Sequence, residues 1–225
     1  MDNPERRIVD LYIFYKYILA AVELYHAWAQ VISLSEYAFV YRDGIDTHLT
    51  QAIQDGWRIG QATENVIIHN CHFARWAITI GSEMSGGVRN IFIEDCKIDS
   101  CRNGIYFKSN LDRGGYFENL NMRRIEADVC LWGVINFRTN YHGYRGGNHP
   151  TLFRNICIED VTCNRVDSVA LMANGLPEAK LYNITLRNIK VKQAPKAIQM
   201  DNVVNLTLDN VEVDGRQITS AEQED

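Results

Sequence analysis

The sequence predicts an all-β protein built as a parallel β-helix, a solenoid in which each coil of chain stacks on the one before. Three observations predict it. A nine-residue pattern occurs six times between residues 65 and 213, apolar and polar residues alternate within each copy, and successive copies begin 22 to 36 residues apart. Alternation with a period of two is typical of strands, and a strand that returns only after a full repeat is typical of stacked coils.

The repeated pattern reads Asn, apolar, any, apolar, any, polar, apolar, any, apolar. About fourteen residues after the first strand begins, each of the first five copies continues into a second short apolar run, so one coil contains at least two strands. The copies begin at Asn65, Asn90, Asn119, Asn155, Asn183 and Asn205, and the second runs occupy 77–80, 104–107, 133–137, 168–172 and 196–200.

No short hairpin dipeptide such as Asn-Gly joins successive strands, which favours parallel stacking of equivalent strands about 4.8 Å apart. The recurring Asn fits the same geometry. At a coil corner, Asn tolerates left-handed backbone and can hydrogen-bond its counterparts in a ladder, so we expect it to be structural rather than catalytic.

Six cysteines occur without a CxxC pair. Cys71 and Cys96 occupy the slot that Ile or Val fills in other copies, which indicates small buried hydrophobes. A disulfide or a metal at that slot is the less favoured alternative, and the sequence predicts no metal site and no cofactor.

Three segments are expected: a divergent, partly helical amino-terminal segment (1–62), the coils (63–215) and a polar tail (216–225). From Ile8 to Val22 the apolar residues follow helical spacing, which predicts an amphipathic helix that caps the first coil. A rearranged amino terminus is the other explanation. The start of the chain resembles neither a signal peptide nor a membrane span.

The net charge of −5 and the pI near 5.7 argue against nucleic acid or an anionic membrane as the main partner. A polyanionic ligand would need a local patch of basic side chains to bind to this acidic protein.

Several strings resemble the polygalacturonase family of glycoside hydrolases over residues 55 to about 215. The resemblance implies a right-handed parallel β-helix, a secreted or periplasmic monomer, and hydrolysis of glycosidic bonds in pectin with inversion. Galacturonan or rhamnogalacturonan would be the polysaccharide. The strings are Asp55-Gly-Trp-Arg-Ile-Gly60, Gly81-Ser-Glu-Met-Ser-Gly-Gly87 and Lys108-Ser-Asn-Leu-Asp-Arg-Gly-Gly115.

Inversion needs a protonated carboxyl and a carboxylate roughly 6.5 to 9.5 Å apart, a spacing that neighbouring coils can supply. The family provides such groups in an Asn-Thr-Asp string, an Asp-Asp pair, a Gly-His-Gly and an Arg-Ile-Lys. In this sequence Asp43, within Asp43-Gly-Ile-Asp46, is the candidate catalytic acid, and nothing after it matches the Asp-Asp pair.

The Gly-His-Gly and Arg-Ile-Lys motifs of the family are matched only in part by this sequence. We assign the Gly-His-Gly slot to Ala74-Arg75-Trp76, which puts Arg75 in place of the His, and the Arg-Ile-Lys slot to Tyr106-Phe107-Lys108. Lys108 is then expected to bind a substrate carboxylate as a point charge, and Tyr106 to stack on a sugar ring. Residues 140–149 form a long loop rich in aromatic, Arg and His side chains, which suits a sugar cleft.

Two functions follow as expectations. The first is an inverting pectin hydrolase. The alternative is a catalytically inactive β-helix that binds oligogalacturonate through Lys108 and Arg75, or a truncated fragment without function.

Overall fold

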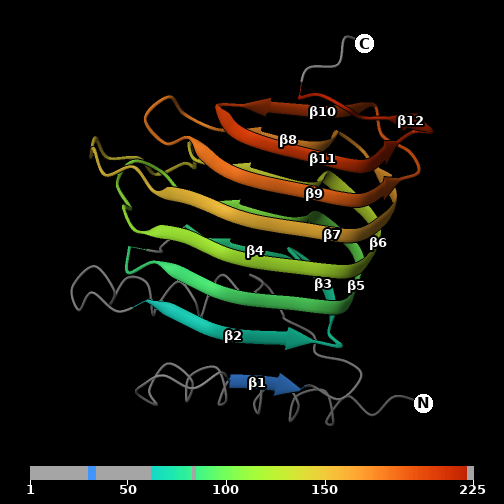
Figure 1. Cartoon of the computed structure of the whole chain (residues 1–225), viewed down its shortest axis with the longest axis horizontal. Coiled ribbons are helices and arrows are strands. Elements are labelled where there is room, and N and C mark those ends of the chain that lie inside the picture. The colour runs from blue at the N-terminus through green and yellow to red at the C-terminus, as the bar shows by residue number, and fades with distance from the viewer. Residues whose placement is uncertain (1–29, 34–61, 83–84, 222–225) are drawn as a thin grey trace.

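The computed structural model describes residues 30–33, 62–82 and 85–221, with the backbone alone for the first of these ranges. Its strands join into one sheet that is parallel except for the β11–β12 pair (Figure 1). The strands are β1 (Gln30–Ser33), β2 (Thr63–His69), β3 (His72–Arg75), β4 (Ile78–Gly81), β5 (Val88–Lys108), β6 (Tyr116–Arg138), β7 (Leu152–Val166), β8 (Val169–Asn174), β9 (Leu181–Val191), β10 (Lys196–Asp201), β11 (Val203–Val213) and β12 (Arg216–Gln217).

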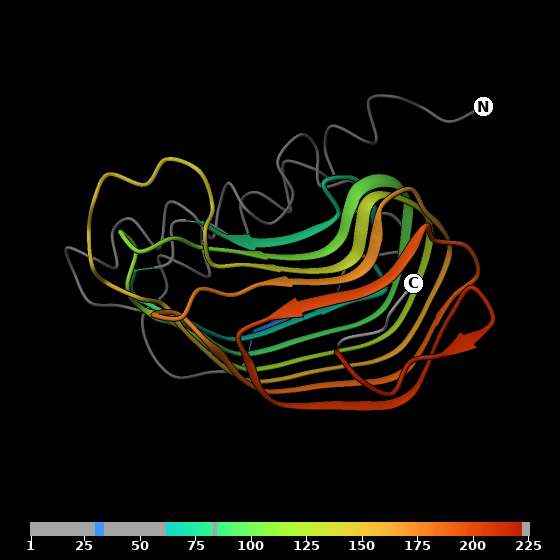
Figure 2. The same cartoon turned by 90° about the horizontal axis from the view of Figure 1, so that it is seen from above.

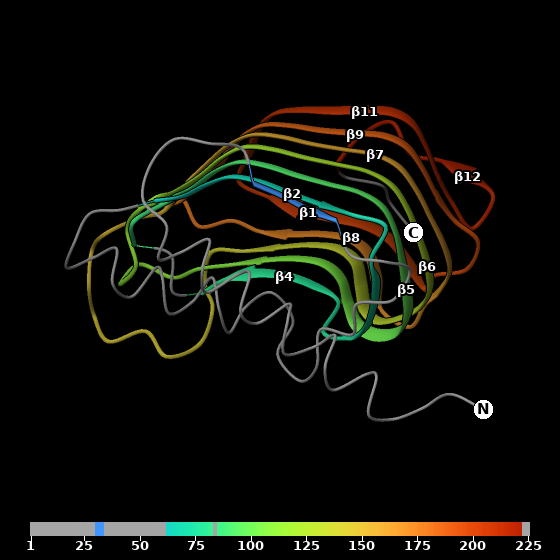
Figure 3. The ribbon, with the colours of Figure 1, turned by 90° about the horizontal axis from the view of Figure 1, so that it is seen from below.

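The sheet wraps into a solenoid with two walls (Figures 2 and 3). The long wall runs in the order β2-β5-β6-β7-β9-β11. The short wall consists of β4, the carboxyl-terminal ends of β5 and β6, β8 and β10, paired in register. Because β5 and β6 turn the corner without a break, each belongs to both walls. The predicted parallel β-helix is confirmed.

Apolar side chains from the two walls meet in the interior. Phe107 of the short wall meets Phe117 of the long wall edge to face, with ring centroids 5.8 Å apart. Each also contacts the next coil of its own wall, Phe107 with Phe137 (4.8 Å) and Phe117 with Phe153 (4.6 Å). Cys96 is in register with Ile125 of the next coil, and both are buried. The described cysteines are free thiols, so the interpretation of Cys71 and Cys96 as small buried hydrophobes is confirmed.

The recurring Asn forms the predicted ladder along one corner of the coils. Each of the six has a positive φ between 55° and 59°, the left-handed conformation that Asn tolerates. Side-chain amides link successive coils, as from Asn90 to Asn65 (3.0 Å) and from Asn183 to Asn155 (2.9 Å). The structural role expected for this Asn is confirmed.

The expected amino-terminal helix and Asp43 lie outside the described residues. In the part of the chain that the structure describes, no helix is long and apolar enough to cross a membrane.

Candidate functional site

The outer face of the short wall ends in two basic residues on adjacent coils. The last residues of its strands form the register column Gly81, Lys108, Arg138, Asn174, Asp201. Residues in one column of a parallel sheet point to the same face, about 4.8 Å apart. Lys108 and Arg138 are therefore neighbouring cations on one edge of an acidic protein.

An aromatic side chain from the loop that follows β6 lies against Lys108. The ammonium of Lys108 is 4.9 Å from the centroid of the Tyr141 ring, a cation–π contact. Tyr106 meets the same ring edge to face, with centroids 6.5 Å apart. Lys108 is only 7% exposed and Tyr106 only 3%, so their side chains are fixed by packing before any ligand binds. The structure thus brings two of the predicted binding residues together.

The loop that carries Tyr141, residues 139–150, projects beyond the carboxyl ends of the short wall (Figure 2). Asn110 donates from Nδ2 to the carbonyl oxygens of Tyr141 and His142, both at 3.3 Å. The carboxylate of Asp112 accepts from the backbone N–H groups of Arg145 (2.6 Å) and Gly147 (2.7 Å). These bonds hold the loop in place, and they commit Asp112 to a structural role.

Gly147 shows how closely the loop approaches Asp112. A Cβ atom at residue 147 would lie 2.6 Å from Oδ1 of Asp112, which is well inside contact distance. A side chain at residue 147 would therefore displace the Asp112 carboxylate and break the bonds that hold the loop.

Arg75 lies at the other end of the short wall. It is exposed, it is the last residue of β3, and its register partner on β5 is Cys101, seven residues before Lys108 on the same strand. The structure does not bring Arg75 together with Lys108 and Tyr106.

Among the described outward positions of the short wall, acidic groups are scarce. The outward register columns are Thr79, Tyr106, Asn136, Met172, Gln199 and Gly81, Lys108, Arg138, Asn174, Asp201. Asp201 is the one carboxyl among these described positions, and it lies three coils from Lys108. That separation is about 14 Å, too far for the two groups to act on one bond.

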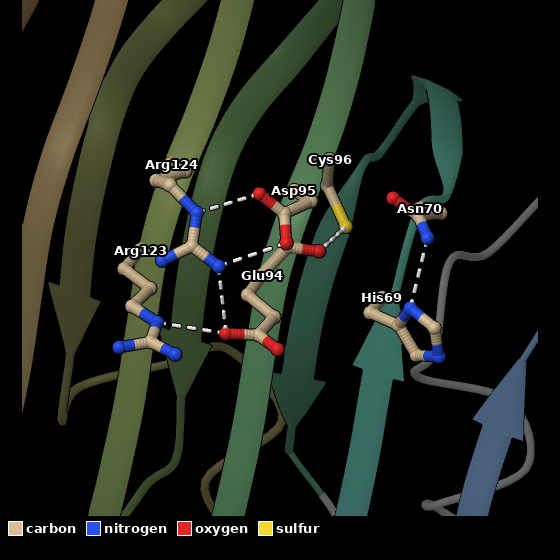
Figure 4. A network of polar contacts seen from close by, with 7 residues as sticks. All are labelled: His69, Asn70, Glu94, Asp95, Cys96, Arg123 and Arg124. Atoms are coloured by element: carbon tan, nitrogen blue, oxygen red, sulfur yellow. Dashed lines mark hydrogen bonds and ion pairs between the residues drawn. The ribbon is translucent and has the colours of Figure 1, made fainter.

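A second cluster of charges lies on the outer face of the long wall (Figure 4). Arg123 Nε donates to Glu94 at 2.7 Å, and Arg124 donates to Glu94 at 2.9 Å and to Asp95 at 2.6 Å. The hydrogen bond from Arg123 holds the pKa of Glu94 below its usual range, and that from Arg124 does the same for Asp95. A carboxyl with a lowered pKa is ionised at neutral pH.

A shallow cavity of about 90 Å³ on this face contains Glu94 and Glu159, two coils apart, with Arg123 between them. The separation approaches that of an inverting pair. Both carboxylates are paired with arginines of neighbouring coils, however: Glu94 with Arg123 and Arg124, and Glu159 with Arg187. We therefore interpret this cluster as an ion-pair ladder that joins coils.

Sequence reasoning missed Arg138, and it singled out the loop 140–149 without naming Tyr141. A signal for Arg138 was present, because Asn136-Phe137-Arg138 aligns with Tyr106-Phe107-Lys108 when the second apolar runs are superposed. Tyr141 carried no comparable signal, because its place is set by the fold of a loop.

Comparisons with known proteins agree with this architecture. The family model described as Glycosyl hydrolases family 28 matches residues 45–207. A protein named "Probable polygalacturonase" from Vitis vinifera is 28% identical over 159 residues, which cover 65% of this chain and 32% of the relative. A "Polygalacturonase" from Ralstonia nicotianae is 30% identical over 166 residues, which cover 70% of this chain and 27% of the relative.

A solved structure has the same fold. The hyperthermoactive exopolygalacturonase from Thermotoga maritima aligns with a TM-score of 0.63 at 22% identity, over 71% of this chain and 37% of that one. This chain therefore spans about a third of the length of the proteins it matches.

Proposed function

Because the chain belongs to glycosyl hydrolases family 28, we propose that it hydrolyses glycosidic bonds in pectin and binds galacturonate carboxylates at the basic end of its short wall. The observation that carries the proposal is the pair Lys108 and Arg138, adjacent in register on an outer face. Two fixed cations beside an aromatic ring suit a chain of uronic acids, in which each sugar offers a carboxylate and an apolar ring face.

Each residue of this end has a distinct proposed role. Lys108, held against Tyr141, offers a point charge to a carboxylate, and Arg138 offers a planar fork that can bind a second carboxylate oxygen. Tyr141, which is partly exposed, offers the ring on which a sugar rests, and the buried Tyr106 supports it edge to face. We propose Asp43 as an acid of the reaction, with inversion at the sugar carbon. Pectin lies outside cells, so the proposal implies a secreted or periplasmic protein.

Backbone conformation suggests a different place for the Gly-His-Gly slot. Arg75 and Ala77 both have positive φ, 65° and 47°, a conformation that glycine adopts without strain. This supports a slot at 75–77 rather than 74–76, with Trp76 in the position of the His and Arg75 in that of a glycine. Arg75 is then a less favoured binding residue than Lys108.

The alternative is a β-helix that binds oligogalacturonate without cleaving it. It is favoured by one observation: among the described outward positions of the short wall, Asp201 is the one carboxyl, and it is remote from Lys108. Under this alternative the basic end keeps its role in binding.

The release of reducing ends from polygalacturonate tests the proposal. Replacing Lys108 with Met keeps the length of the side chain and removes its charge. A charge-assisted hydrogen bond is worth about 1.5–3 kcal/mol, so kcat/KM is expected to fall roughly 10- to 150-fold.

The matched control is Lys97→Met, because Lys97 is exposed on the surface, 3.8 Å from Glu126. This variant is expected to keep wild-type activity. Full activity in a folded Lys108→Met variant would contradict the proposed site. Binding of polygalacturonate without any release of reducing ends would establish the non-catalytic alternative.

A further inference from the structure

We propose that Trp76, Arg102 and Trp132 form a second sugar-binding platform, which stacks against one uronic acid residue of the polysaccharide. The inference rests on the proposed function, since it assumes that a galacturonan is the ligand. It adds a site at the opposite end of the short wall from Lys108 and Arg138.

The three side chains come from three successive coils and converge at the corner that leads into the short wall. The guanidinium carbon of Arg102 lies 4.6 Å from the centroid of the Trp76 ring and 5.2 Å from that of Trp132. The two indoles meet edge to face, with centroids 5.9 Å apart. Each member therefore restrains the other two, and the cluster is ordered without a ligand.

The exposure of Trp132 is unusual for a tryptophan. Trp132 is 43% exposed and its neighbour Leu131 is 44% exposed. Trp is usually well covered in folded proteins, and an exposed apolar patch with a polar rim often marks a binding surface. Packing in the core does not require an indole here, because the interior of this corner is filled by Cys101 and Cys130.

The charge of Arg102 supports an acidic ligand. No carboxylate of the described part of the chain pairs with Arg102, whose described contacts are the two indoles. Ion pairs with carboxylates are instead made by Arg89, Arg123, Arg124, Arg154, Arg165 and Arg187.

A uronic acid matches both features of the platform. Its ring presents C–H groups that pack on an aromatic face, and its carboxylate can accept from a guanidinium fork. Arg102 and Lys108 lie six residues apart on β5, which limits their separation to about 20 Å. One polysaccharide chain of several sugars can therefore reach both sites.

Calorimetric titration with polygalacturonate tests the platform, with neutral galactan as the second ligand. Trp132→Ala is expected to weaken binding of polygalacturonate about tenfold, the value of one stacking contact. Arg102→Gln is expected to weaken polygalacturonate and to leave any binding of galactan unchanged. Phe92→Ala is the matched control, because Phe92 is an exposed aromatic (46%) on the outer face of the long wall.

The outcomes separate this inference from the proposed function. If Lys108→Met weakens binding while Trp132→Ala and Arg102→Gln match the wild type, the platform is wrong and the proposed function stands. If Trp132→Ala and Phe92→Ala weaken binding equally, the effect is not specific and the platform is also wrong. If the wild-type protein neither binds nor cleaves polygalacturonate, both proposals are wrong.

Discussion

On the long wall, Glu94 and Asp95 are ionised at neutral pH because arginines of the next coil donate hydrogen bonds that lower their pKa values. Glu94 and Asp95 lie opposite Arg123 and Arg124, and each arginine donates to a carboxylate across the gap between coils (Figure 4). Both groups are partly exposed, so water screens the attraction and each pair is worth little by itself. Their effect is clearest in how stability depends on pH.

Stability is expected to fall in acid through these two groups. The pKa of each is lowered in the folded protein, by hydrogen bonds from Arg123 and Arg124 respectively. Their contribution is therefore present above the unfolded values, near 4.3 for Glu and 3.9 for Asp, and is lost as pH falls through the lower folded values. Urea unfolding measured from pH 6 down to pH 3 checks this.

The double variant Glu94→Gln, Asp95→Asn is expected to show a shallower loss of stability over that range. Glu178→Gln is the control, because Glu178 is exposed and makes no ion pair with a described residue. An unchanged pH slope in the double variant would contradict the role given to the pairs.

At the scale of the element, the corner Asn residues fix where each coil turns. Asn119 donates to Asn90 at 3.3 Å and accepts from Asn155 at 3.2 Å, and its φ is 55°. One residue therefore supplies both a left-handed backbone and two links between coils. These two roles explain why the position is Asn in every copy. Gly would adopt the left-handed backbone but would lack the side-chain bonds between coils.

Replacing Asn119 separates these two contributions. Asn119→Ala loses both ladder bonds, at about 0.5–1.5 kcal/mol each, and places Ala in a conformation that costs about 1–2 kcal/mol more. Asn119→Gly loses the bonds alone, so it is expected to destabilise less than Ala. Denaturant unfolding measures both, and Asn121→Ala is the control within the same strand. Equal costs for Ala and Gly would show that backbone strain is not involved.

The repeat predicted the strands, the corners and their parallel order because those features depend on local pattern and recur coil after coil. Lys108 and Tyr106 were predicted from the resemblance to the family's Arg-Ile-Lys string, and the structure brings both side chains to the Tyr141 ring. The loop 140–149 was expected to suit a sugar cleft, but Tyr141 was not singled out in it, because bonds to Asn110 and Asp112 set the fold of the loop that brings Tyr141 to Lys108. Arg75 was placed with the binding residues by alignment alone, whereas the structure puts it at the far end of the short wall.

At the scale of the whole molecule, the two walls differ in chemistry. The long wall carries ion pairs in which acids and bases alternate between coils, such as Glu159, Arg187 and Asp209. The short wall ends in the adjacent cations Lys108 and Arg138, and Asp201, the one carboxyl among its described outward positions, lies three coils from Lys108. An acidic protein thus presents one basic edge, and a polyanion is expected to bind there despite the overall charge of −5.

The most direct test of this account compares the affinity of the protein for polygalacturonate with its affinity for the methyl-esterified polymer, whose carboxylates are neutral. The wild-type protein is expected to bind the acid form at least tenfold more tightly at low salt, and less so as salt rises. Lys108→Met combined with Arg138→Gln is expected to reduce the difference strongly, leaving at most the share that Arg102 contributes. Equal affinity of the wild-type protein for the two polymers would contradict the claim that the basic end recognises galacturonate carboxylates.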